Sequence, residues 1–243
     1  MFKHIVSFSG GKDSTAMLLK MIENKMKIDE IVFCDTTVEF DEMYEHIKQV
    51  KSMIKRRITV LTPNEDFEYY LLHHEKKNGE LGYGFPTMKN RWCTSLFKRD
   101  IMNKYLNKKY KRHTVVLYQG IALDEIERTE KNNDGRIIKY PLIDFEMTEK
   151  DCLEYCYSKG LSWGGLYEDF NRMSCWCCPL SNHKELEIIY RKYPNKWEKL
   201  KQWEKALGKQ FRPECSISDL ENKFRLEWCV WMEINTKKRN FTM

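Results

Sequence analysis

A glycine pair flanked by hydroxyl side chains lies near the start of this chain, between an apolar run and a segment with helical periodicity. Residues 4–8 have the apolar character of a buried strand, and apolar residues recur at helical spacing over 15–22. Gly10 and Gly11 let the backbone approach an anion closely, and amides at the start of a helix point toward it. A strand, turn and helix in this order predict a doubly wound α/β sheet with a phosphate at the turn.

The side chains of this turn are those that a nucleotide phosphate requires. Ser9 and Ser14 can donate hydrogen bonds, Lys12 can neutralise phosphate charge, and Asp13 can hold Mg²⁺ or cap the helix. The segment differs from the common P-loop, because Lys12 follows the glycine pair directly and an aspartate comes next. The alternative interpretation is a glycine-rich turn with an ordinary helix cap.

Strand-like and helical segments alternate over the first 145 residues, which predicts a parallel sheet covered by helices on both faces. The pattern then becomes helical and rich in tryptophan, with a capping-box signature at Ser218 and Glu221. We therefore expect a nucleotide-binding α/β domain over 1–145 and a helical C-terminal subdomain over 146–243. The tryptophans expected to build its core are Trp163, Trp197, Trp203, Trp228 and Trp231. The expected strands are 4–8, 30–35, 58–62 and 114–120, and the expected later helices are 148–160, 183–192, 195–207 and 217–236.

Polar residues follow the second and fourth expected strands, at the sheet edge where ligands of such folds bind. Asp35 and Thr36 come after the second strand, and Gly120 permits a tight exit from the fourth. Asp124 and Arg128 then face the same crevice, and arginine suits a phosphate or sulfate. The alternatives are a helix-capping loop and an exposed charged turn. The predicted nucleotide-binding residues are Ser7, Ser9, Gly10, Gly11, Lys12, Asp13, Ser14, Asp35, Thr36 and Gly120.

Bulk properties restrict the class of protein. The 243 residues include 32% charged and 42% hydrophobic residues, which is typical of a globular chain, and no apolar run approaches a membrane span. With no visible signal peptide, we expect a cytoplasmic protein with no membrane partner and with reduced thiols. The net charge of +6 permits an anionic partner, and the short basic runs 55–57 and 108–112 are more typical of solvated faces.

Four motifs, taken in order, carry a resemblance to a known family. The first is similar to the PP-loop of the ATP pyrophosphatase (adenine nucleotide alpha-hydrolase) superfamily, which has a Rossmann-like fold of the HUP type. All four together resemble the phosphoadenosine phosphosulfate (PAPS) reductase family over roughly residues 3–180. The resemblance implies an adenine nucleotide and either sulfonucleotide reduction or ATP-dependent adenylation before sulfur chemistry. The motifs are Ser-Gly-Gly-Lys-Asp-Ser at 9–14, Asp-Thr-Thr-Val-Glu-Phe at 35–40, Arg-Trp-Cys-Thr at 91–94 and Gly-Ile-Ala-Leu-Asp-Glu at 120–125.

The sequence departs from the reductases at two positions. Thr37 stands where they usually carry glycine. Their Glu-Cys-Gly tail is matched only by Glu214-Cys215-Ser216, which lies well before the end of the chain. A reductase that uses Cys215 as its nucleophile therefore remains the alternative to adenylation.

Nine cysteines, three of them within four positions, indicate a metal site rather than a disulfide framework. The prediction is a [4Fe–4S] cluster on Cys93, Cys175 and Cys178, with Cys177, Cys215 or an open position on the fourth iron. Zinc with His183 is the rival, and free or buried thiols are the third interpretation.

The expected reaction is attack of a substrate oxygen on the α-phosphate of Mg²⁺-bound ATP, release of pyrophosphate, and sulfur transfer to the adenylated substrate. The acceptor is a nucleic acid or a small metabolite, and a homodimer is left open. A non-catalytic nucleotide-binding component of a complex is a further alternative. The predicted catalytic residues are Lys12, Asp13, Ser14, Asp124 and Arg128, with Cys215 for the reductase, and the predicted metal ligands are Cys93, Cys175, Cys177 and Cys178.

Overall fold

The computed structural model describes residues 1–131 and 135–226, and the chain divides into two compact units. The first unit comprises Met1–Asp66 and Cys93–Cys175, and the second comprises Phe67–Trp92 and Trp176–Met243. The chain therefore leaves the first unit, contributes to the second and returns. The expected functional boundary at residue 145 stays a prediction.

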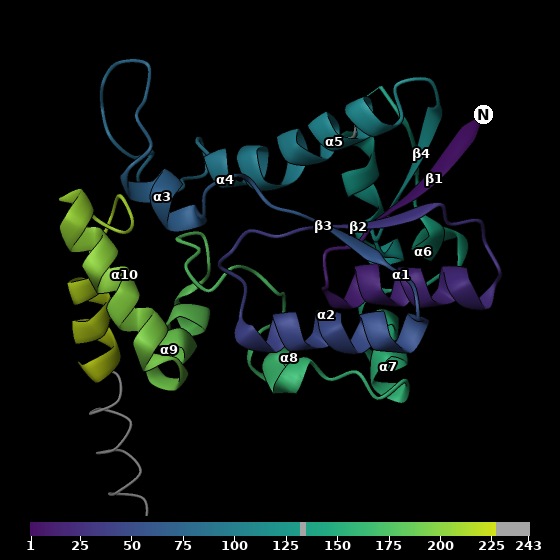
Figure 1. The fold of residues 1–243 in the computed structure, drawn as a ribbon. Coiled ribbons are helices and arrows are strands. Elements are labelled where there is room, and N and C mark those ends of the chain that lie inside the picture. Colours follow the sequence, from purple (N-terminus) through teal and green to yellow (C-terminus); the bar gives the residue numbers. More distant parts are fainter. Residues whose placement is uncertain (132–134, 227–243) are drawn as a thin grey trace, which may run out of the picture. The chain divides into compact units, whose positions relative to one another are not determined.

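A five-stranded parallel sheet forms the centre of the first unit, in the order β3-β2-β1-β4-β5 (Figure 1). The α/β, Rossmann-like class expected from the sequence is confirmed. The order reverses at β1, which pairs with β2 on one side and β4 on the other, so that Ile5 lies opposite Glu30 and Leu117. The strands are β1 (Phe2–Ser7), β2 (Glu30–Cys34), β3 (Ile58–Leu61), β4 (Thr114–Gln119) and β5 (Ile137–Lys139).

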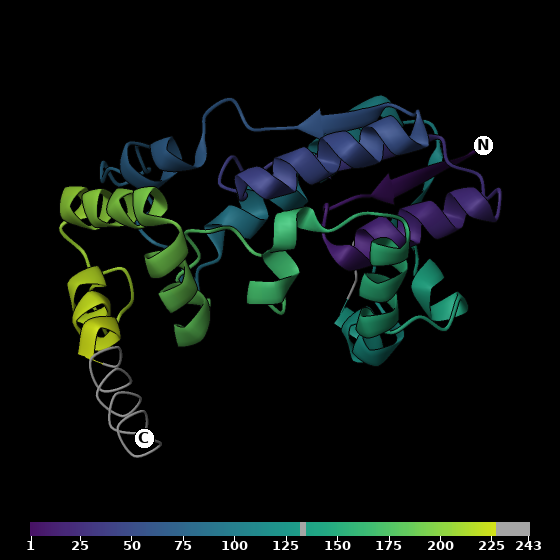
Figure 2. The same ribbon diagram turned by 90° about the horizontal axis from the view of Figure 1, so that it is seen from below.

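Helices cover both faces of this sheet. α1 and α2, which follow β1 and β2, lie on one face, and α5 lies on the other (Figures 1 and 2). Ile5 and Leu117 pack with Met102 and Leu106 of α5 in one apolar cluster, and α7 packs against α1. The helices of this unit are α1 (Lys12–Glu23), α2 (Asp41–Ile54), α4 (Trp92–Thr94, at the unit boundary), the π-helix η1 (Ser95–Asp100), α5 (Ile101–Lys109), the 3₁₀ segment η2 (Leu123–Lys131), α6 (Pro141–Asp144), α7 (Glu149–Ser158), the 3₁₀ turn η3 (Trp163–Gly165) and α8 (Leu166–Asp169).

The second unit is helical and has an aromatic core. Trp176 stacks on Trp203 with ring centroids 5.2 Å apart, and Trp197 packs against Phe224 at 5.9 Å. Trp197 and Trp203 are buried, as the sequence predicts, whereas the buried Trp163 belongs to the first unit. Trp228 and Trp231 lie outside the described residues. The helices are α3 (Phe67–Leu72), α9 (His183–Lys192), α10 (Pro194–Leu207) and a last segment described over 217–226.

Two local predictions are wrong. The cap of the last helix is Ser216, whose hydroxyl accepts from the Asp219 amide while Asp219 accepts from the Ser216 amide. Ser218 lies inside the helix. Strand β5 is also absent from the predicted set, because its three residues are too few to show a period. The part of the predicted helix beyond residue 226 lies outside the described residues.

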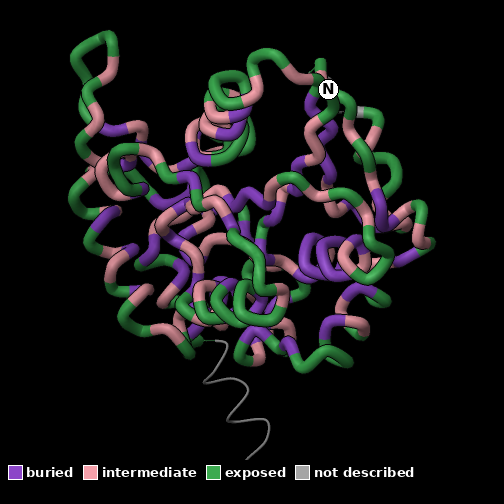
Figure 3. Tube along the Cα trace, turned by 45° about the vertical axis from the view of Figure 1, so that its right-hand side comes forward, coloured by how far each residue is buried: buried purple, intermediate pink, exposed green. Residues whose placement is uncertain are grey.

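Burial follows the expected layering, with exposed residues along the loops and outer helix faces (Figure 3). Within the described ranges, every helix is too short or too polar to cross a bilayer.

Candidate functional site

The predicted phosphate loop lies at the reversal point of the sheet order, where β1 and β4 are neighbours. Residues 8–11 connect β1 to α1, and Gly120 follows β4. A Cβ on Gly120 would lie 2.8 Å from both the amide nitrogen and the Cα of Ser14. Only glycine lets the end of β4 approach the start of α1 this closely, so the loop after β4 forms part of the same site.

Gly10 gives the loop its shape. Its φ of +81° is a left-handed conformation that favours glycine. Its carbonyl accepts a 2.7 Å hydrogen bond from the indole nitrogen of Trp163, which also stacks on His46 with ring centroids 4.2 Å apart. Burial of the His46 imidazole lowers its pKa to about 3, so this ring is neutral and acts in packing.

Lys12 is the most constrained residue of the loop. Its side chain is 6% exposed, and its Nζ lies 2.7 Å from Glu149 Oε2 and 3.5 Å from Asp13 Oδ2. Its amide donates to the Tyr167 hydroxyl at 2.8 Å. The amino group is thus held in place by carboxylates.

Asp13 has an unusual environment for a carboxylate. Its Oδ1 is buried and has no hydrogen-bond partner among the described residues. Burial raises the pKa of Asp13 to about 6; Lys12 opposes this shift, whereas Glu149 and Glu125 add to it. A buried carboxylate oxygen without a partner is suited to a proton or a hard cation such as Mg²⁺, which is commonly bound by one or two carboxylates together with phosphate oxygens.

The two serines of the loop bond to each other. Their Oγ atoms lie 2.9 Å apart, and the Ser9 amide donates to Ser14 Oγ at 3.1 Å. Ser7 ends β1 directly before them. The hydroxyl pair is therefore oriented by the loop itself, at the start of α1 where helix amides favour an anion.

The segment after β2 is folded around its own polar side chains. Asp35 accepts from the Thr37 amide and from the Tyr44 hydroxyl, both at 2.8 Å. Thr37 has a φ of +64°, which accounts for the glycine that the resembled reductases carry there. The buried Thr36 donates to Glu39 at 2.8 Å, and its hydroxyl lies 3.3 Å from Cys175 Sγ.

The charged residues after β4 are bonded to protein groups. Asp124 accepts from the amide of Glu149 at 3.0 Å, at the start of α7. Arg128 is exposed and pairs with Glu125. Asp124 thus positions Glu149, the partner of Lys12, and the predicted catalytic roles of Asp124 and Arg128 stay predictions.

The cysteines predicted as metal ligands are divided between the two units. Cys93 and Cys175 belong to the first, whereas Cys177 and Cys178 belong to the second. The described residues contain no group of three or more His, Cys, Asp or Glu side chains arranged to hold a metal ion. His183, which is exposed and begins α9, belongs to no such group among the described residues.

The first unit does gather thiols around one lysine. Lys98, on the π-helix η1, has a carbonyl that accepts from Cys34 Sγ at 3.8 Å. Desolvation alone would lower the pKa of Lys98, but negative charge on its neighbours raises it above the usual value. Those neighbours are Cys175, Glu39, Cys93 and Cys34.

Several site residues carry no local sequence signal. Glu149, Trp163 and Tyr167 reach the loop from more than 130 positions away in the sequence. Lys98 lies just after the Arg-Trp-Cys-Thr motif and is not among the residues that the sequence predicts for the site. These contacts exist because α7 packs against α1 and η3 packs against α2.

Comparison with known proteins identifies a family. The family model described as "phosphoadenosine phosphosulfate reductase domain" matches residues 3–181. The chain belongs to this family. Two uncharacterized proteins of Methanocaldococcus jannaschii, MJ0973 and MJ0066, are 30% and 28% identical over 79% and 84% of the chain, which spans 46% and 41% of their length. An uncharacterized 37.8 kDa protein of Escherichia phage 186 is 23% identical over 84% of the chain and 75% of its own length.

Among solved structures, a PAPS reductase from Candida auris in a phosphate complex aligns with a TM-score of 0.48 and 14% identity. The alignment covers 72% of this chain and 81% of that one.

Proposed function

We propose that this protein binds ATP at the PP-loop and catalyses attack of a substrate oxygen on the α-phosphate, with release of pyrophosphate. The observation that carries the proposal is the Lys12–Glu149–Asp13 group: a buried lysine held by carboxylates, beside an unpartnered carboxylate oxygen, at the reversal point of a parallel sheet. Sheets of this order bind nucleotides at that point.

The loop residues have separate roles in this reaction. Lys12 breaks its ion pair with Glu149 and binds the leaving phosphates. The charge that develops on these phosphates is stabilised by Lys12, by the amides at the start of α1 and by the Ser9 and Ser14 hydroxyls. Asp13 Oδ1 would hold Mg²⁺, which when bound neutralises phosphate charge. Asp124 fixes the position of Glu149 and hence of the lysine it holds.

The second half of the proposed reaction is sulfur transfer. Hydrosulfide, as the sulfur nucleophile, attacks the carbon that bears the adenylated oxygen. The carbon–oxygen bond breaks, AMP leaves, and the sulfur stays on the substrate as a thiol. The observation behind this step is the group of thiols near Lys98 in the first unit. Burial raises the pKa of the Cys34 thiol to about 11, with Lys98 only partly opposing the shift, so Cys34 itself is not the proposed nucleophile. A cysteine-bound [4Fe–4S] cluster stays a prediction, and no step above requires it. An anaerobic iron and acid-labile sulfide assay with a visible absorption spectrum tests it, with stoichiometric zinc as the contrary result.

The name of the matched family model supports one alternative, reduction of a sulfonucleotide, although Cys215, the predicted nucleophile, lies outside the matched residues 3–181. Burial is the main cause that raises the pKa of the Cys215 thiol, and Arg212 only partly opposes the shift. The Cys215 amide and carbonyl are bonded to Arg212 in a tight turn before the last helix. A thiol with a raised pKa is a weak nucleophile at neutral pH, which favours adenylation over this role.

Product analysis distinguishes these reactions. Pyrophosphate and AMP formed from ATP support adenylation, whereas sulfite formed from PAPS or adenylyl sulfate with a thiol reductant supports reduction. Loss of sulfite formation in Cys215→Ser would assign the nucleophile. Tight ATP binding without turnover for any acceptor would favour a non-catalytic nucleotide-binding component. Absence of ATP, AMP and sulfonucleotide binding in calorimetry on folded protein would contradict all three.

A further inference from the structure

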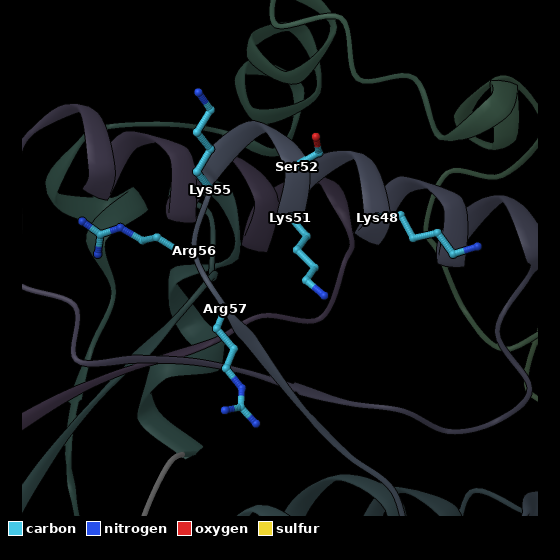
Figure 4. A pocket seen from close by; sticks show the side chains of 6 residues that line it. All are labelled: Lys48, Lys51, Ser52, Lys55, Arg56 and Arg57. Carbon is cyan, nitrogen blue, oxygen red and sulfur yellow. The ribbon is translucent and has the colours of Figure 1, made fainter.

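The opposite edge of the same sheet, where the strands begin, carries a strong positive charge that the nucleotide site does not use. The first group lies where α2 ends and β3 begins. Lys51, Lys55, Arg56 and Arg57 are all exposed there, and the described residues provide none of them with an ion-pair partner. Together with Lys48 and Ser52 they line an open hollow of about 580 Å³ (Figure 4).

Further cations precede the neighbouring strands. Lys25 and Lys27 precede β2, and Lys108, Lys111 and Arg112 precede β4. All five are exposed, and each lacks an ion-pair partner within 1–131 and 135–226. Because the sheet order is β3-β2-β1-β4, these loops lie side by side along one edge. We call these nine residues the basic edge: Lys25, Lys27, Lys51, Lys55, Arg56, Arg57, Lys108, Lys111 and Arg112.

The acidic residues at this edge are already occupied. Asp29 pairs with Lys3 at 3.4 Å, Glu30 with Lys109 at 2.7 Å, and Glu23, at the end of α1, with Lys159 at 2.7 Å. Lys109 also contacts the rings of Tyr105 and Tyr110. Apart from an electrostatic interaction of Lys27 with Asp29, these carboxylates therefore leave most of the charge of the basic edge without a partner among the described residues.

Helix electrostatics account for only part of this arrangement. A cation in the last turn of a helix interacts favourably with the helix dipole, which explains Lys51. Arg56 and Arg57 lie beyond the end of α2, and Lys55 adopts a left-handed φ of +50° at the C-cap. Figure 4 shows Lys51 and Arg57 extending to one side of the helix end and Lys55 extending to the other.

We propose that the basic edge binds the phosphate backbone of a nucleic acid. From β3 to β4 the strand starts span about 15 Å, since adjacent strands lie about 4.8 Å apart. A duplex carries one charge per about 1.7 Å of its axis, so several phosphates face a band of this width, whereas a free nucleotide would occupy one compact site. A second hollow of about 400 Å³, lined by Lys111 and Arg136, lies at the same edge. Concave surfaces suit a convex backbone better than a flat membrane.

The proposed interaction is independent of sequence, because it depends on phosphate contacts rather than on base edges. It also does not depend on the proposed chemistry, because the PP-loop lies at the opposite ends of the strands. The surface would hold the polymer while the other edge binds a nucleotide.

The test is fluorescence anisotropy with a labelled 20-nucleotide DNA strand and a 20-base-pair duplex, titrated at several KCl concentrations. The variant Lys51→Gln/Lys55→Gln/Arg56→Gln/Arg57→Gln should lose at least about tenfold in affinity at 100 mM salt. The magnitude of the slope of log K against log salt should fall by up to about 3.6 for the duplex, since each of the four phosphate contacts contributes about 0.9. Circular dichroism checks that this variant is folded.

A matched control removes the same charge elsewhere. Lys77→Gln/Lys184→Gln/Lys205→Gln/Lys209→Gln also changes four exposed lysines, all in the second unit, and reaches the same net charge of +2 (6 minus 4). It should bind within about twofold of the wild type. Equal losses in both variants would assign binding to net charge alone and overturn the proposal.

Three more measurements separate the basic edge from the PP-loop and from a lipid-binding surface. Lys12→Met should leave oligonucleotide binding intact, whether or not the PP-loop binds ATP, so failure of one proposal is distinguished from failure of the other.

The lipid alternative is tested with vesicles of phosphatidylserine and phosphatidylcholine. If the basic edge binds these vesicles and does not bind oligonucleotides, the nucleic-acid assignment is overturned. In the wild type, hydrogen exchange should slow at 48–57 and 108–112 when duplex is added; no change there would also overturn it.

Discussion

The two edges of one parallel sheet place positively charged side chains in opposite environments. At the carboxyl edge Lys12 is buried, and two carboxylates and the Tyr167 hydroxyl fix its position. At the amino edge nine exposed cations have no ion-pair partner among the described residues. A buried, neutralised lysine has one geometry, which suits a small ligand that replaces its carboxylate partner. Exposed side chains form an adjustable field, which suits an extended polyanion.

Replacement of Lys12 should give the largest contrast between the edges. Lys12→Met should weaken ATP binding by about 100-fold and lower the free energy of unfolding by about 2 kcal/mol, because Glu149 and Asp13 lose their counter-charge. Calorimetry and urea denaturation measure the two effects. Lys51→Met at the other edge should change ATP affinity less than about twofold and stability by less than about 0.5 kcal/mol.

A double variant separates the loss of ATP affinity in Lys12→Met from the loss of stability. In Lys12→Met/Glu149→Gln the unpaired carboxylate at Glu149 is removed, so stability should return while ATP affinity stays low. Recovery of both would mean that Lys12 maintains the fold of the loop and does not contact phosphate.

The next largest effect should come from Gly120→Ala. The added methyl group meets backbone atoms of Ser14 at 2.8 Å, which forces the end of β4 away from α1. We expect a loss of about 2 kcal/mol in stability and loss of measurable ATP binding. Gly79→Ala is the control: its φ of +80° carries strain, but the new Cβ meets nothing within 4 Å and lies in the second unit. Unchanged ATP affinity in Gly120→Ala would place the nucleotide elsewhere.

The sequence predicts some of the residues that form the carboxyl edge and not others. The glycine pair, Lys12 and Gly120 are visible because strand, turn and helix each have a local pattern. Glu149, Trp163 and Tyr167 are not visible, since their roles arise from packing between helices far apart in the chain. The basic runs of the amino edge are visible in the sequence, but only the strand order brings them together along one edge.

The pH dependence of the free energy of unfolding should distinguish the buried Asp13 carboxylate from the exposed cations of the amino edge. Because the folded-state pKa of Asp13 is about 6 and its ordinary value is 3.8, protonated Asp13 favours the folded state. That stability is fully present below about pH 4 and is lost as pH rises through 6, by about 3 kcal/mol in total. Asp13→Asn should remove this part of the pH dependence, measured by urea denaturation between pH 4 and 8. Identical pH dependence in both proteins would show that Asp13 is not desolvated.

The smallest predicted effect tests whether Trp163 shapes the loop or merely fills space. Trp163→Phe keeps an aromatic ring beside His46 but removes the hydrogen bond to the Gly10 carbonyl, at a cost of about 1 kcal/mol in stability. Trp197→Phe removes a similar indole bond, to Glu221 at 3.0 Å, within the second unit. Both variants should lose comparable stability, but only Trp163→Phe should weaken ATP binding, by a few-fold. If neither changes ATP affinity, the left-handed turn at Gly10 is maintained without the indole, and the rigidity of the carboxyl edge resides in Lys12 and its carboxylates.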